Sequence, residues 1–89
     1  MIKLIAISPH GPSRLDLSFS DGSHGLWSAE PLLARDTVLT RALADHAYFA
    51  RAFIEAGALA WPNGLELSAW SLRDELREAG RLIAPTKAA

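Results

Sequence analysis

Arg14–Gly22 reads RLDLSFSDG and decides the fold, because apolar and polar residues alternate along it up to a turn dipeptide. Leu15, Leu17 and Phe19 share one face of an extended chain, as in a strand that is buried on one side. The dipeptide Asp21-Gly22 that follows is the strongest short-range signal for a β-hairpin. The stretch therefore predicts a strand that turns back at Gly22 and pairs with the residues after it.

The length of the turn sets which residues pair across this hairpin. A two-residue loop at Asp21-Gly22 pairs Phe19 with His24 and Leu17 with Leu26. This register predicts His24 on the apolar face beside Phe19 and directs Trp27 to the opposite face. Trp27 then either packs under a helix or forms an exposed anchor for a partner.

The rest of the chain contains weaker signals of the same kind, which predict short elements on both sides of a second hairpin. They are a strand over 2–8 covered on both faces, a helical turn over 28–33, broken helical turns over 36–50 (with one continuous helix as the alternative), a hairpin over 52–61, a short extended piece over 65–67, and a helix that is capped by Ser68 or Ser71 and ends near Gly80 or a few residues beyond. The predicted fold is α+β: one small antiparallel sheet of four to five strands, with short helical turns and a C-terminal helix packed on it. Residues 1–84 form the single domain, and 85–89 form a frayed tail.

Composition excludes several classes of protein. The chain has 89 residues, a net charge of −1, no cysteine and 49% apolar residues, which suits one ordered domain. Without cysteine there is no disulfide, thiolate metal site or cysteine nucleophile. The balanced charge provides no field that attracts nucleic acid, and no apolar run approaches the roughly 20 residues that span a bilayer. We expect a cytoplasmic protein without membrane contact.

Two turn motifs stand at a characteristic distance from each other: Phe19-Ser20-Asp21-Gly22 and Trp61-Pro62-Asn63-Gly64. Leu32-Leu33 and a helical turn containing Phe49 lie between them. In this order residues 3–76 resemble the bacterial domain-of-unknown-function family 2442.

The resemblance implies a small α+β domain and no established activity. Members of that family commonly stand beside small toxin-like partners, which implies an antitoxin-like or regulatory partner of a small neighbouring protein. The chain departs from the family pattern at His24, where an apolar residue is usual, and at Ser28, where an aspartate is usual.

The sequence contains no recognisable catalytic motif. No serine stands in the G-x-S-x-G pattern, and no two histidines have the spacing that places two metal ligands on one helix face. We predict no cofactor, no metal and no enzymatic activity. The alternative, a small-ligand binder or enzyme, would use His24, Asp16 and Ser18 and would need a pocket of roughly 300 Å³ or more lined by them.

The C-terminal helix contains the clearest candidate for a binding surface. Arg73, Arg77 and Arg81 recur every four residues and predict a basic ridge beside an acidic one. The function predicted is a non-catalytic protein-interaction module that binds another protein chain through Trp27, Arg73, Arg77 and Arg81. A nucleic acid on the same ridge is the alternative, which the adjacent acidic ridge disfavours. A second copy of the chain is a further expected partner, through an exposed sheet edge or a tryptophan patch.

Overall fold

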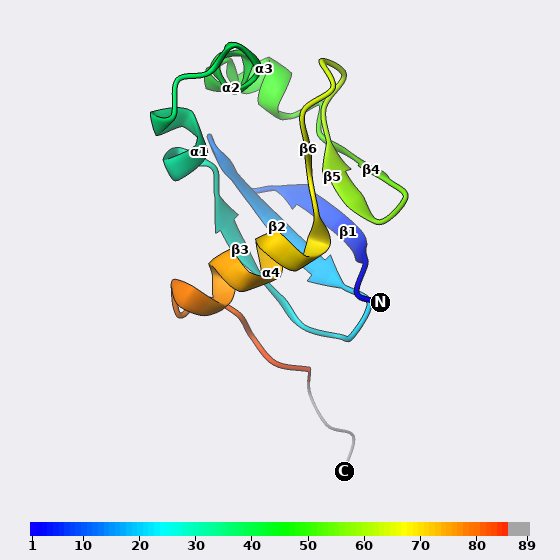
Figure 1. Cartoon of the computed structure of the whole chain (residues 1–89). Coiled ribbons are helices and arrows are strands. Elements are labelled where there is room, and N and C mark those ends of the chain that lie inside the picture. The colour runs from blue at the N-terminus through cyan, green and yellow to red at the C-terminus, as the bar shows by residue number, and fades with distance from the viewer. Residues whose placement is uncertain (86–89) are drawn as a thin grey trace.

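The computed structural model describes residues 1–85, and Figure 1 shows the path of the chain. The elements are β1 (Leu4–Pro9), β2 (Arg14–Phe19), β3 (His24–Ser28), α1 (Glu30–Ala34), α2 (Val38–Arg41), the 3-10 turn η1 (Ala42–Ala44), α3 (His46–Phe49), β4 (Phe53–Glu55), β5 (Ala58–Ala60), β6 (Glu66–Leu67) and α4 (Ala69–Glu78). The predicted α+β class is confirmed. Of the predicted tail over 85–89, all but Pro85 lies outside the described residues.

The strands form two sheets in place of the single four- to five-stranded sheet that was predicted. Both are antiparallel and three-stranded, in the orders β1-β2-β3 and β4-β5-β6. The helical segment 30–49 between them leads the chain away from the edge of β3, to the end of the molecule where α1, α2 and α3 gather (Figure 1). The sheets meet where the Leu4 N–H donates to the Gly57 carbonyl at 2.8 Å. The two hairpins were predicted correctly, but the prediction that they join into one sheet is wrong.

The first hairpin has a register one residue away from the predicted one. Ser18 lies opposite His24, and Leu15 lies opposite Trp27. Because side chains alternate along a strand with a period of two, a shift of one residue exchanges the two faces of β3. His24 therefore lies on the exposed face of the sheet and Trp27 on the face with Leu15 and Leu17, so each occupies the face that was predicted for the other. The packing of Trp27 against a helix, one of the two alternatives, is confirmed.

The shift comes from the turn. The Phe19 N–H donates to the Ser23 carbonyl at 2.9 Å, so the loop has three residues in place of two. One oxygen of Asp21 accepts hydrogen bonds from the Ser23 N–H at 2.9 Å and from its hydroxyl at 2.6 Å. These bonds hold Ser23 opposite Phe19. The Asp21-Gly22 dipeptide by itself does not predict them, because they depend on the serine that follows it.

The predicted burial of the N-terminal strand on both faces is wrong. β1 is an edge strand, because β2 pairs with it on one side and β3 lies beyond β2. Only Leu4 is buried in it, and Ile5 is 61% exposed. A continuous apolar run indicates a covered strand only when layers lie on both sides of it, and that is decided by the rest of the fold.

The broken helical turns predicted over 36–50 are confirmed as α2, η1 and α3. Thr37 and Thr40 cap α2 reciprocally, since each side chain accepts from the other's backbone N–H. Asp45 accepts from the Ala47 N–H at 3.1 Å and starts α3 as a separate helix. Ser68 likewise caps α4, which ends at Glu78.

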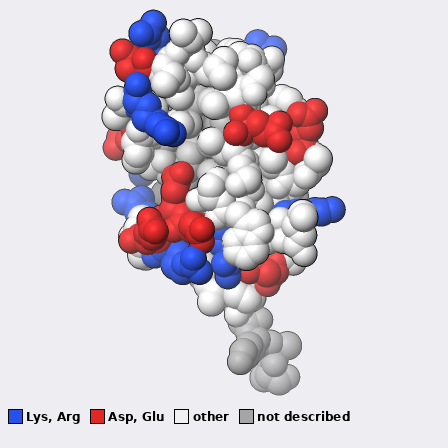
Figure 2. Space-filling view, in the orientation of Figure 1, with Lys and Arg blue, Asp and Glu red and all other residues white. Residues whose placement is uncertain are grey.

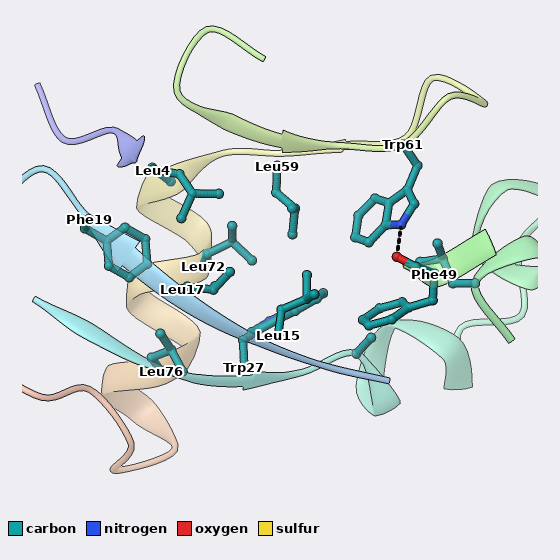
Figure 3. Close-up of a cluster of buried hydrophobic side chains, with 13 residues drawn as sticks. Leu4, Leu15, Leu17, Phe19, Trp27, Phe49, Leu59, Trp61, Leu72 and Leu76 are labelled. Atoms are coloured by element: carbon teal, nitrogen blue, oxygen red, sulfur yellow. Dashed lines mark hydrogen bonds between the residues drawn. The ribbon is translucent and has the colours of Figure 1, made fainter. Parts of the chain in front are cut away.

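The core lies between the first sheet, the second sheet and α4. Figure 3 shows Leu17 of β2, Leu59 of β5 and Leu72 of α4 pointing toward one another. Phe19 and Trp61, the apolar residues of the two turn motifs, belong to this one core.

Candidate functional site

One exposed face at the start of α4 combines an aromatic ring, a cation and a hollow. Trp70 is 54% exposed, and the guanidinium of Arg73 lies 5.9 Å from the centroid of its ring. Both side chains line a hollow of about 350 Å³, together with Met1, Ile2 and Asp21. We call this surface the Trp70–Arg73 face.

Arg73 is held in place from the first hairpin. Its Nε lies 3.3 Å from an Asp21 carboxylate oxygen, and the two side chains are 23% and 37% exposed respectively. The Arg73 Nε is buried and has no hydrogen-bond partner within residues 1–85. Its nearest acidic neighbour is the Asp21 carboxylate, so the contact between them is an ion pair without hydrogen-bond geometry.

The same hairpin turn lowers the pKa of Asp21. The Ser23 hydroxyl and then the Ser23 backbone N–H, which both donate to this carboxylate, hold the pKa of Asp21 below its ordinary value of 3.8. The positive charge of Arg73 acts in the same direction, whereas partial burial acts against it.

The Asp21 carboxylate is expected to stabilise the fold at neutral pH and to lose this contribution in acid. Because the folded pKa lies below the unfolded value of 3.8, the contribution is complete above that pH and is lost as the pH falls through the folded pKa. The stability difference between the wild type and Asp21→Asn, measured by urea unfolding, should therefore shrink below pH 3.8. Ser23→Ala removes the strongest donor and should weaken this pH dependence. A difference that stays constant down to low pH would contradict the role of the turn.

A second hollow lies on the other side of α4, along β3. It measures about 290 Å³ and has mostly apolar walls from Leu76 of α4, from Ala79 at the end of that helix and from Leu26 of β3. Glu75 also lines it, and its carboxylate accepts a hydrogen bond from the Trp27 indole N–H at 2.8 Å. We call this hollow the β3 cavity.

The four residues predicted to bind a partner do not form one surface. Trp27 is 2% exposed, so its interpretation as an exposed anchor is wrong, although it and Arg81 both line the β3 cavity. Arg73 belongs to the other hollow, and Arg77 forms an ion pair with Asp74. The predicted basic ridge is interrupted, because α4 ends before Arg81.

The hairpin brings only part of the alternative catalytic group together. Ser18 and His24 lie opposite each other on the exposed side of the first sheet. Asp16 points to a different histidine, since its carboxylate lies 3.3 Å from the Nδ1 of His10. Neither of the two hollows is lined by these residues. Within residues 1–85 no group of three or more His, Asp or Glu side chains is placed to hold a metal ion.

The sequence prediction missed Trp70, although a signal for it was present. Successive residues of an α-helix are 100° apart, so Trp70 lies about 200° from the buried Leu72 and on the outward side. Arg73 and Arg77 follow it at i+3 and i+7 and share its side of the helix. The spacing of the arginines was used to predict a binding surface, but the tryptophan in the same row was not included in it.

Charges over α4 are mixed. Figure 2 shows acidic and basic side chains next to one another in this region, not a continuous basic surface. Arg73 and Arg77 each have an aspartate partner, Asp21 and Asp74 respectively.

In the part of the chain that the structure describes, no helix has the length and apolar character needed to cross a membrane.

No family model, no curated protein and no solved structure matches this chain. The resemblance to family 2442 therefore stays a prediction from the two turn motifs. What the protein does has to be inferred from the two hollows and their side chains.

Proposed function

We propose that this protein is a non-catalytic protein-interaction module that binds a partner protein through the Trp70–Arg73 face. The observation that carries the proposal is the pairing of an exposed tryptophan, 54% accessible, with a guanidinium 5.9 Å from its ring. Tryptophan and arginine are the residue types that most often contribute the largest share of binding energy at interfaces. In this proposal Trp70 fills a hollow of the partner, and Arg73 bonds to a carbonyl or carboxylate there.

The electrostatics favour a protein partner over a nucleic acid. Binding to a phosphate backbone draws its free energy from many unpaired cations on one surface. Here Arg73 already faces Asp21, and Arg77 faces Asp74. The net charge of the whole chain is −1. An antitoxin-like or regulatory role toward a small neighbouring protein, which the family resemblance implies, is the biological form of this proposal.

The proposal is tested by capture with the full chain as bait, in the wild type and three variants. Trp70→Ala and Arg73→Ala remove the two anchors. Val38→Ala removes an 81% exposed apolar residue of α2 and serves as the matched control. We expect to capture a protein that binds the wild type and Val38→Ala equally. Its affinity for Trp70→Ala should be about 30-fold lower than for the wild type, as is usual for the loss of an interface anchor.

Other outcomes count against the proposal. A captured protein that binds all four baits equally would place the interface elsewhere on the molecule. Capture of nucleic acid, with an affinity that falls steeply as salt is raised, would support the alternative function. Urea unfolding of each bait shows whether a loss of binding comes from a loss of structure.

A further inference from the structure

β3 is an edge strand whose outer side is only partly occupied. The peptide groups of Gly25 and Trp27 face β2, so those of His24 and Leu26 point away from the sheet. At His24 this outer side is used: its N–H donates to the Ile83 carbonyl at 3.0 Å and its carbonyl accepts from the Ile83 N–H at 2.7 Å. At Leu26 the N–H and the carbonyl have no backbone partner among residues 1–85.

The chain's own strand addition stops after one residue for a local reason. The N–H groups of Arg81 and Leu82 both donate to the Leu76 carbonyl, at 2.8 and 3.2 Å, and close the end of α4. Ile83 is therefore the first residue free to pair with β3. The bridge between Ile83 and His24 shows that an antiparallel segment fits against this edge.

The β3 cavity adjoins the unpaired peptide groups of Leu26. Side chains of an added strand alternate between the two faces of the sheet, so the neighbours of the residue that pairs with Leu26 point toward α4. There they meet Leu76 and Ala79, which can cover an apolar stem, and the carboxylate of Glu75. The Trp27 indole N–H holds this carboxylate in place by donating a hydrogen bond to one of its oxygens at 2.8 Å.

The charges that line the β3 cavity favour a positive end on the side chain that enters it. Glu30 and Glu75 both line it, against the single cation of Arg81. Neither glutamate forms an ion pair within the part of the chain that the structure describes. A long side chain with an apolar stem and a positive end, that of lysine or arginine, matches these walls.

We propose that the β3 cavity binds an extended segment of another polypeptide by strand addition at Leu26, with a lysine or arginine of that segment placed on Glu75. Backbone hydrogen bonds to the sheet edge provide the affinity, and the pocket for the alternate side chain provides the selectivity. This site is separate from the Trp70–Arg73 face, so each can fail without the other.

The test is selection from a display library of random heptapeptides on the full chain. We expect selected peptides to share one lysine or arginine between β-branched residues and to shift the amide NMR signal of Leu26. Glu75→Gln keeps an acceptor for Trp27 but removes the charge, and should weaken binding about tenfold, equivalent to about 1.4 kcal/mol. Leu26→Pro removes the N–H and should weaken it at least as much. Trp70→Ala should bind the peptides as the wild type does.

Several results would overturn the proposal. These are no selected peptide, selected peptides without a basic residue, equal binding to Glu75→Gln, or binding that Trp70→Ala abolishes. A dimer in sedimentation experiments that Leu26→Pro dissociates would assign the edge to a second copy. If Leu26→Pro does not fold, methylation of the peptide nitrogen that faces Leu26 removes the other hydrogen bond of the same pair, the one that the Leu26 carbonyl accepts, and should also weaken binding.

Discussion

Trp61→Ala is expected to lower the free energy of unfolding by about 3–5 kcal/mol, the usual cost of truncating a large buried aromatic residue. The ring is 1% exposed and lies 5.8 Å from that of Phe49, centroid to centroid. Its indole N–H also donates a hydrogen bond to the Phe49 carbonyl at 3.0 Å. The substitution removes this donor from the buried carbonyl. Domains have only about 5–15 kcal/mol of stability, so this loss is a large fraction of the total. Urea unfolding followed by far-ultraviolet circular dichroism measures the change.

Trp70→Ala provides the matched control for this substitution. It removes the same side chain from a position that is 54% exposed. We expect a change in stability of about 0.5 kcal/mol or less, as for most surface substitutions. If the two variants were equally stable, Trp61 would not hold α3 and the second sheet together as the structure shows.

Gly25→Ala is expected to lower the free energy of unfolding by about 1–3 kcal/mol, the typical cost of adding atoms to a packed interior. A Cβ at this position would lie 2.7 Å from the Arg81 carbonyl oxygen and 3.2 Å from a methyl carbon of Leu76. The first of these atoms belongs to the backbone that ends α4, so the helix end has to move. The clash should exceed the roughly 0.4–1 kcal/mol that replacing a glycine contributes by restricting the unfolded chain.

His24→Ala, at the neighbouring position of β3, is the control for this effect. His24 is exposed, and its side chain points to the opposite face of the sheet. Its truncation should change the free energy of unfolding by about 0.5 kcal/mol or less. A Gly25→Ala variant as stable as His24→Ala would contradict the close approach of the α4 end to β3, and with it the shape of the β3 cavity.

The features that the sequence predicted correctly depend on nearby residues. The alternation of Leu15, Leu17 and Phe19 places one face of β2 in the core, as observed. Asp45 and Ser68 cap helices because their side chains reach N–H groups two or three residues ahead. In each case the whole interaction lies within a few residues of sequence.

One error was local: the register of β3 differs from the predicted one because Asp21 bonds to Ser23, two residues ahead, and that single step exchanged the faces of His24 and Trp27. The other errors arose where a residue's environment comes from distant segments. The exposure of Ile5 depends on which strand lies in the middle of the sheet. For the candidate sites, the spacing of the arginines was visible, but their separation into two hollows depends on where α4 ends.

The amino-acid sequence by itself determined the class of fold, the two hairpins and the helix starts. Those features follow from apolar spacing and from side chains that bond to their own neighbourhood, which are properties of short segments. Only the tertiary structure decided that the strands form two sheets, that Trp27 packs against α4, and that Leu26 keeps an open edge beside Glu75. These depend on which surfaces meet in space, because burial and unpaired hydrogen-bonding groups are defined only after distant segments have packed together.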